Sequence, residues 1–411
     1  MCARRIFPYP EERVLEDAAY ARGGTPTLIV PFLLPVWCVE IEATVTDAEP
    51  YGLIDRYLER GIAEAGLATP AELARFFALD DTLVDRALRV LRRIEHVTAG
   101  PDDRLVLTEL GLRSVRDQVR YIERHRDRRK LYFDAFGSRP LTRRYYDPAT
   151  VTLLTGADLP DLERQGGPAF RMPLSLRAFH DGALAALAGL PDRDRFNLPD
   201  RIESPVRVGD PECVFLPVYV VRAVGSDGVA RLLAYTQAAD TADEDIGEIC
   251  RGSPEVAGLV EVEERASAAG RAEERVREWL RKLGMDGVHP VRLPGGMLRV
   301  TLPASAFGAN GANRGNGGPL SPRKIGSFAV LGCHVCQIWC TDERVRRRAL
   351  LRGVADFIAP RVRVKRADLE ALATRLGRQV GLGAVDRDDL RRLAAQAGEH
   401  DLLRRLDDID D

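Results

Sequence analysis

The chain has 411 residues, which is too long for one ordinary domain, so about two to four folded units are expected. Its 45% hydrophobic and 30% charged residues are those of a water-soluble, folded protein. The formal net charge of -2 excludes a global attraction to nucleic acid or to an anionic membrane, so binding of either kind requires a local basic patch.

No targeting or membrane segment is predicted. The first residues carry charge, but no apolar core of signal-peptide length follows them. The apolar stretch Thr27–Val39 is short and is interrupted by Pro31 and Pro35, so it cannot span a bilayer. Seven cysteines at irregular spacing predict reduced thiols without a disulfide framework. We therefore expect a cytoplasmic protein that does not enter a membrane.

The N-terminal segment, residues 1–50, is predicted to be extended. Within it, Val39–Val45 alternates apolar and polar residues, which is the pattern of a half-buried strand. This strand leads directly into a region of helical periodicity.

Three helices are predicted after the extended segment. The first, from Tyr51, repeats apolar residues at helical spacing. The second begins at Thr69, which is placed to cap it, and Glu72 completes a capping box. The third runs from Thr82 to Arg93 and carries one continuous apolar stripe, made of Leu83, Val84, Ala87, Leu88 and Leu91.

A small β-hairpin and a closing helix follow. Ile94–Val97 and Arg104–Leu107 are predicted strands, and a turn at Gly100–Asp103 joins them. Thr108 is placed to cap the closing helix, which begins within Leu-Thr-Glu-Leu-Gly.

This order of elements, closed by Leu107–Gly111, resembles the winged helix-turn-helix superfamily over residues 51–118. In that superfamily the third helix enters the major groove and the hairpin contacts phosphates. The resemblance implies contacts to double-stranded DNA from Arg86, Arg89, Arg93 and Arg104. Asp80, Asp81 and Asp85 depart from that pattern, because carboxylates repel the phosphate backbone. The alternative is a winged helix that serves only packing or protein contact.

A basic connecting helix, residues 119–130, is predicted to continue the closing helix. Its cations include Arg120, Arg124, Arg128 and Lys130. Such a helix beside a winged helix would lie along the phosphate backbone and add salt-sensitive affinity. The alternative is an exposed connecting helix with a solvated charged face.

The rest of the chain is predicted to form a mixed α+β domain, residues 131–341, and a helical C-terminal region, residues 342–411. The predicted strands of the mixed domain include two antiparallel hairpins, 213–224 with 229–236 and 288–291 with 297–302, and a strand at 258–262. The expected fold class is therefore an α+β multi-domain protein with an N-terminal winged helix, a central mixed α/β region with antiparallel hairpins, and a helical C-terminal region.

The strongest candidate metal cluster is Cys333, His334, Cys336 and Cys340. We interpret Ser327–Cys340 as one buried strand, on which Cys333 faces away from the other two cysteines. The thiols would then pack as small hydrophobic side chains rather than bind zinc. The sequence alone leaves the zinc alternative open.

Two further motifs are assigned structural roles. The carboxylates between Asp240 and Glu248 mark a predicted helix start, where the helix dipole favours acidic side chains. The glycine-rich stretch 308–319 lacks the Gly-Lys-Ser/Thr of a phosphate-binding loop. No catalytic residue, metal ion or cofactor is predicted.

The resulting hypothesis is a non-enzymatic, DNA-binding winged-helix protein that acts within a larger assembly, in genome defence or transcription regulation. Double-stranded DNA and protein partners are expected, and no oligomeric state is predicted. One alternative is a protein-interaction adaptor without direct DNA contact. The other is an enzyme whose site lies unrecognised in the central α+β domain.

Overall fold

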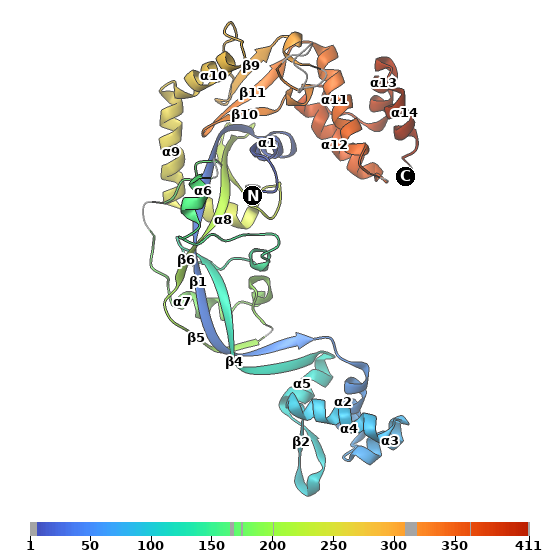
Figure 1. The fold of residues 1–411 in the computed structure, drawn as a ribbon. Helices are drawn as coiled ribbons and strands as arrows, with labels where there is room; N and C mark the ends of the chain where they lie inside the picture. Colours follow the sequence, from blue (N-terminus) through green and yellow to red (C-terminus); the bar gives the residue numbers. More distant parts are fainter. Residues whose placement is uncertain are drawn as a thin grey trace. The chain divides into compact units, whose positions relative to one another are not determined.

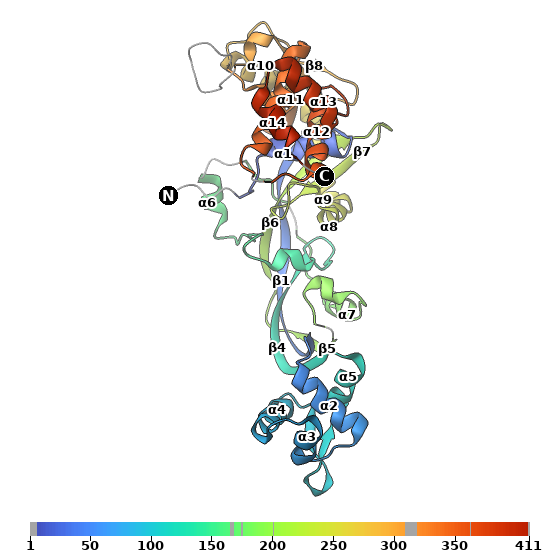
Figure 2. The same ribbon diagram turned by 90° about the vertical axis from the view of Figure 1, so that its right-hand side faces the viewer.

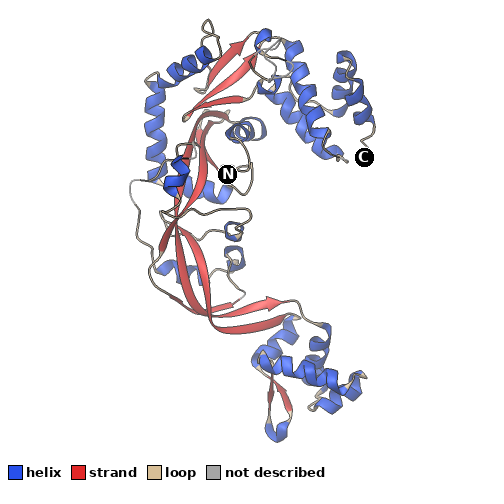
Figure 3. Ribbon diagram, in the orientation of Figure 1, coloured by secondary structure: helices blue, strands red, loops and turns tan. Residues whose placement is uncertain are grey.

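The computed structural model describes residues 6–164, 168–173, 176–199, 201–308, 319–361 and 363–409. The chain divides into two compact units, each assembled from several segments. Unit 1 contains Met1–Pro35, Pro148–Leu176 and Phe215–Asp411, and unit 2 contains Val36–Asp147 and Arg177–Val214. Helices and strands occur in both (Figures 1 and 3), so the prediction of a mixed α+β protein is confirmed.

Unit 2 combines a group of helices with long paired strands. After the part of β1 (Thr25–Glu49) that follows Pro35, its elements are α2 (Leu53–Ala65), α3 (Pro70–Phe77), α4 (Asp81–Arg93), β2 (Val97–Ala99), η2 (Pro101–Asp103), β3 (Leu105–Leu107), α5 (Glu109–Asp117), β4 (Arg120–Asp134), η3 (Arg143–Tyr146), α7 (Gly182–Ala188), η4 (Arg193–Phe196) and β5 (Arg201–Arg207). Figures 1 and 2 show α2, α3, α4 and α5 gathered beside the β2–β3 hairpin.

The basic segment 119–130 is a strand, so the prediction of a connecting helix there is wrong. Helix α5 ends at Asp117, because Gln118 adopts a left-handed backbone conformation with φ of 59°. From Arg120 the chain pairs antiparallel with β1, and Glu49 lies opposite Arg120. Pairing with a strand more than seventy residues earlier supplies backbone hydrogen bonds along the whole segment. These hydrogen bonds outweigh the local preference of the sequence for a helix.

Hydrophobic side chains stabilise one face of this strand pair. Val39 and Ile41 of β1 and Leu131 and Phe133 of β4 are buried, together with side chains of α7. Alternate residues of a strand point to opposite faces, so the charged neighbours of these four residues lie on the other face. The predicted strand Val39–Val45 is therefore confirmed as part of the longer β1.

The helices α2 to α5 share a separate core with the small hairpin. It contains Leu58, Leu73, Leu88, Leu105 and Val115, among other buried residues. The predicted capping box at the start of α3 and the predicted Thr108 cap of α5 are both present. Helices, hairpin and closing helix thus follow the predicted order, because side-chain caps mark the starts of α3, α4 and α5 and apolar periodicity marks the helices.

Unit 1 is built around a sheet in the order β7-β6-β1-β11-β9-β8, with β10 paired to β11. Besides the start of β1, its elements are α1 (Glu11–Glu16), the π-helix η1 (Asp17–Ala21), α6 (Leu159–Arg164), most of β6 (Glu212–Val224), β7 (Ala230–Tyr235), α8 (Glu244–Arg251), α9 (Pro254–Ala268), α10 (Arg271–Lys282), β8 (Val291–Arg292), β9 (Leu298–Leu302), η5 (Ala304–Ala306), η6 (Pro322–Lys324), β10 (Phe328–Leu331) and β11 (His334–Cys340). The glycine-rich residues 309–318 lie outside the described part of the chain.

Several predicted strands of this unit are found and one is not. Strand β6 pairs antiparallel with β7, and β8 pairs antiparallel with β9, as the two hairpin signals indicate. The predicted strand 258–262 is instead the middle of α9, which Ser253 caps through the backbone N–H of Val256. The apolar run was too short to distinguish a strand from a helix turn.

The C-terminal part of unit 1 is helical, as predicted. It contains α11 (Glu343–Ile358), α12 (Arg366–Gln379), α13 (Arg387–Ala397) and α14 (His400–Asp407). Their apolar faces share one core with β9 and β11. Within the described ranges, every helix is too short or too polar to cross a membrane.

Candidate nucleic-acid interface

Helix α4 separates an apolar face from a basic one. Val84, Ala87, Leu88 and Leu91 are buried in the core of the helical group. The opposite face is exposed and carries Arg86, Arg89, Arg92 and Arg93. Because an α-helix has 3.6 residues per turn, the apolar residues share one face and these arginines share the other. Burial of the apolar face therefore directs the guanidinium groups to solvent.

These arginines have no acidic partner among the residues that the structure describes. No ion pair within 4.0 Å joins Arg86, Arg89, Arg92 or Arg93 to a described carboxylate. Asp85 lies one helical turn before Arg89 and still makes no such pair. The positive charge of this face is therefore available to an external anion.

One of the three acidic residues near the start of α4 has a structural role as its N-cap. Asp80 is the N-cap, and its carboxylate accepts a hydrogen bond from the backbone N–H of Thr82 at 2.9 Å. Hydrogen bonds from the Thr82 hydroxyl and backbone N–H hold the pKa of Asp80 below its usual value. Asp81 and Asp85 remain exposed acids at the N-terminal half of the helix. Positive charge consequently dominates only the C-terminal half of α4.

The small hairpin carries one predicted contact residue. Arg104 is exposed immediately before β3 and makes no ion pair with a carboxylate in the described ranges. Asp102 and Asp103 precede it in the left-handed region, with φ of 57° and 58°. The backbone N–H of Leu105 donates to the carbonyl of Ala68 at 2.8 Å, which fixes the hairpin to the start of α3.

The four predicted contact residues of the basic segment lie on β4 and not on a helix. Arg120 makes ion pairs with Glu49 at 2.6 Å and with Asp55 at 3.3 Å. Arg128 pairs with Glu42 at 3.2 Å. These charges are compensated by the acidic face of the neighbouring strand.

The same compensation extends along the strand pair. Arg124 contacts Asp47 at 3.4 Å and Glu49 at 3.7 Å. Lys130 lies directly opposite Glu40 in the strand register. The structure therefore does not gather Arg120, Arg124, Arg128 and Lys130 into an uncompensated basic face.

One exposed arginine of α4 was missed in the sequence hypothesis. Arg92 lies three residues after Arg89, so it belongs on the same side of the helix. That spacing was a sufficient signal for including it with Arg86, Arg89 and Arg93.

A buried ionisable pair connects the helical group to β4. His96 and Glu59 have fully buried side chains, and the imidazole Nδ1 lies 2.6 Å from Glu59 Oε1. The second ring nitrogen hydrogen-bonds to the backbone carbonyl of Tyr121 in β4. The other carboxylate oxygen of Glu59 has no hydrogen-bond partner among the described atoms. Neither residue was selected from the sequence, because the two lie far apart in the chain.

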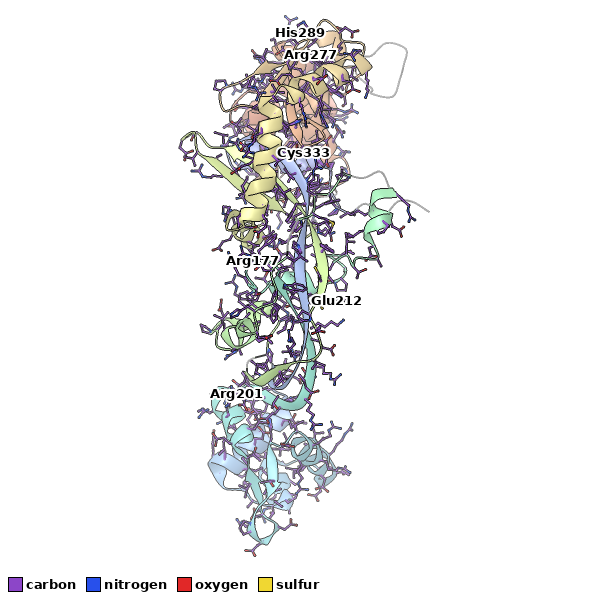
Figure 4. All side chains as sticks on the ribbon, turned by 90° about the vertical axis from the view of Figure 1, so that its left-hand side faces the viewer. Arg177, Arg201, Glu212, Arg277, His289 and Cys333 are labelled. Carbon is purple, nitrogen blue, oxygen red and sulfur yellow. The ribbon has the colours of Figure 1, made fainter. Side chains whose placement is uncertain are left out.

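The cysteine cluster is buried in unit 1. Cys336 and Cys340 lie on β11 and belong to the core shared with the C-terminal helices. The interpretation of Ser327–Cys340 as one strand is wrong, because Gly332, with φ of 73°, turns the chain between β10 and β11. Figure 4 labels Cys333, which follows this turn and accepts a hydrogen bond at its carbonyl from the N–H of Ile29.

The thiols and histidines do not form a reactive or metal-binding group in the described part of the chain. Burial raises the pKa of the Cys333 thiol to about 11 and that of the Cys336 thiol to about 12, which disfavours the nucleophilic thiolate. His289 is exposed and lies away from Cys333 in Figure 4. No group of three or more metal-ligating side chains is found among the described residues.

The acidic cluster of the central region caps a helix. Asp243 is the N-cap of α8, and its carboxylate accepts a hydrogen bond from the N–H of Ile246 at 3.2 Å. Glu244 and Asp245 then occupy the first turn, where the helix dipole stabilises negative charge. The helix begins at Glu244, within the acidic stretch that the sequence marks as a helix start.

Comparison of the chain with protein-family models, with curated proteins and with solved structures gives no match.

Proposed function

We propose that residues 51–118 are a winged helix that binds double-stranded DNA through α4 and the β2–β3 hairpin. The observation that carries the proposal is the row of exposed guanidinium groups on α4 that no described carboxylate neutralises. A helix of this kind fits the major groove, and its arginines can contact phosphates or the acceptor atoms of guanine.

The arrangement around α4 supports this proposal. Helix α3 precedes α4 by a short turn in which Ala78 adopts a left-handed conformation with φ of 53°. The hairpin follows α4 directly and presents Arg104. Third helix and hairpin are the two parts that winged helices place on DNA.

The proposal is confined to α4 and the hairpin. Arg120, Arg124 and Arg128 of β4 already have carboxylate partners, so contact with phosphate would require those pairs to break. Protein partners, and a place in genome defence or transcription regulation, are proposed only by analogy, because both roles suit a winged helix fused to a large mixed domain.

Fluorescence anisotropy with a labelled DNA duplex, measured across a range of salt concentrations, tests the proposal. The variant Arg86→Gln, Arg89→Gln, Arg93→Gln removes three exposed charges and keeps good helix formers. Each lost phosphate contact reduces the salt slope by about 0.9, so the slope should fall by about 2.7 if all three bind phosphate. Affinity at low salt should fall by about 100-fold or more.

A matched control is Arg265→Gln, Arg392→Gln, Arg404→Gln. These three arginines are also exposed on helices, and their replacement changes the net charge equally. The control should bind DNA like the parent protein. Equal losses in both triple variants would assign the effect to net charge, and an unchanged α4 variant would contradict the proposal.

A second candidate, the adaptor, is favoured by an apolar patch on α2 and α3. Leu53 is 69% exposed and Phe76 is 62% exposed, and Tyr57 is also exposed beside them. The ring of Phe77 lies 6.1 Å from that of Tyr57 and 5.0 Å from that of Phe76. Exposed aromatic side chains are typical of protein interfaces. Absence of DNA binding at all salt concentrations would favour this candidate.

A further inference from the structure

Unit 2 contains a polar cavity that the DNA-binding proposal does not use. Its volume is about 530 Å³, within the range of small-molecule sites. The wall is formed by the end of β1, by one residue each of β4 and η3, and by the segment around η4; its charged and amide side chains are named below where they are used. Its polar lining is suited to a charged ligand rather than an apolar one.

The carboxylates on the β1 side of the cavity are both paired with arginines. Asp47 accepts hydrogen bonds from Arg129 at 3.0 and 3.2 Å, and Arg124 lies 3.4 Å away. Glu49 is paired with Arg120 and Arg124. Arginine pairing therefore reduces the repulsion that these two acids exert on an anion, although Arg120 and Arg129 also pair with Asp55 and Asp127.

Two further guanidinium groups line the cavity. Arg143 begins η3, is exposed, and makes no ion pair with a described carboxylate. Arg193 begins η4, and its Nη1 donates to the carbonyl of Ala188 at 2.6 Å, which fixes the side chain. Two guanidinium groups from different segments therefore line one cavity, and guanidinium is the side-chain group best suited to bidentate contact with phosphate oxygens.

Beside these cations are one carboxylate and one amide. Asp194 is exposed and has no ion-pair partner in the described ranges. Asn197 ends η4 in the left-handed region, with φ of 62°. A ligand that fits this wall therefore has an anionic end for the arginines and a hydrogen-bond donor for the carboxylate.

We propose that the cavity binds a small phosphorylated molecule. Its phosphate is held by Arg143 and Arg193, and a hydroxyl or amino group elsewhere on it donates a hydrogen bond to Asp194. A sugar phosphate or a nucleotide meets both requirements. The cavity shares no residue with α4 or the hairpin, so an experiment that contradicts one of the two proposals leaves the other untested and intact.

Isothermal titration calorimetry of the full chain with inorganic pyrophosphate and with ribose 5-phosphate tests the site. The parent protein should bind both probes. Arg143→Gln should weaken both at least about tenfold, because it removes a charge-assisted contact to phosphate. Asp194→Asn should weaken ribose 5-phosphate and leave pyrophosphate binding unchanged or stronger, because pyrophosphate has no sugar hydroxyl to donate to this residue.

The matched control is Arg195→Gln, which removes an exposed arginine of the same short helix that does not line the cavity. It should bind both probes like the parent. Circular dichroism establishes that each variant is folded, and Arg143→Lys, which keeps the charge, should retain pyrophosphate binding. Failure of the parent to bind either probe, or equal binding by Arg143→Gln, would overturn the proposal.

Discussion

Helix α4 and strand β4 carry comparable runs of arginine in the sequence, but the structure treats their charges differently. The arginines of α4 are exposed on one face and have no described carboxylate partner. On β4, Arg120, Arg124 and Arg128 each lie within 4.0 Å of a carboxylate. A run of basic residues therefore gives a positive surface only where no acidic side chains lie beside it in space.

The physical cause of the difference is strand pairing. Residues opposite each other in an antiparallel pair have Cβ atoms about 5 Å apart, so opposite charges meet directly. Glu42 lies opposite Arg128, and Glu49 lies opposite Arg120. On a surface helix, only residues three or four positions apart in the same helix become neighbours. Helix α4 has few acidic residues at these spacings from its arginines.

The largest expected effect comes from the buried pair that joins the two regions. His96→Ala removes the partner of the buried Glu59 and the hydrogen bond to the Tyr121 carbonyl of β4. The free energy of unfolding should decrease by about 3 kcal/mol, because an unpaired buried carboxylate remains. Urea unfolding followed by circular dichroism measures this change.

His289→Ala is the control for that experiment, because His289 is exposed. It should change the stability by less than about 0.5 kcal/mol. Equal effects of the two replacements would mean that the buried pair does not hold the helical group to β4.

The same pair should make stability depend on pH. Burial raises the pKa of Glu59, while the hydrogen bond and charge of His96 and the charge of Arg120 oppose the rise. The folded protein therefore retains this proton to higher pH than the unfolded chain, whose glutamate pKa is about 4.3. The stabilising contribution of Glu59 is complete below about pH 4.3 and is lost as the pH rises through the raised pKa.

Glu59→Gln should remove that part of the pH dependence. The measurement is the free energy of unfolding of the parent and of the variant across the acidic range. The difference between the two curves should change with pH in the stated direction, and parallel curves would show that Glu59 does not titrate differently in the folded state.

Removing the carboxylates that pair with the β4 cations should let β4 contribute to DNA binding as we propose for α4. Glu40→Gln with Glu42→Gln removes the carboxylates that face Lys130 and Arg128. If the DNA-binding proposal holds, affinity should increase several-fold and the salt slope should steepen by about 0.9 for each cation that gains a phosphate. Fluorescence anisotropy across salt concentrations measures both quantities.

The control for the released cations is Glu261→Gln with Glu278→Gln. These exposed acids pair with Arg265 and Lys282 on helices of unit 1, and the net charge changes equally. An equal gain in affinity would assign the effect to net charge rather than to β4.

The smallest expected effect is on DNA binding when the paired arginines are removed. Arg120→Gln, Arg124→Gln and Arg128→Gln together should change affinity by less than about twofold, because these charges are already compensated. Stability should fall by about 0.2–1 kcal/mol for each lost ion pair. A loss of affinity like that of the α4 variant would instead support the original hypothesis that this segment lies on phosphates.

The elements that the sequence predicts correctly are those specified by local signals. Thr69 and Glu72 form the predicted capping box, and the apolar stripe of α4 is buried as its period indicates. The β6–β7 hairpin also follows from its strand pattern and its Gly-Ser-Asp-Gly turn. Each of these features depends on residues a few positions apart, so one sequence contains all the information required.

The failures share a different cause. The basic segment 119–130 became a strand because β1 pairs with it, and the residues that decide this lie about eighty positions away. Glu59 contacts His96 from 37 positions earlier in the chain, and Arg143 and Arg193 line one cavity although they come from separate segments. No local pattern marks these encounters.

The sequence by itself determined the helices and hairpin of residues 51–118, the helical C-terminal part and the exposed direction of the α4 arginines. Only the tertiary structure decided which charges are neutralised, which ionisable groups are buried together and which segments form a cavity. The physical reason is that caps and periodicity act within a few residues, whereas Coulomb interactions and desolvation depend on distances in space between segments that the chain order leaves unspecified.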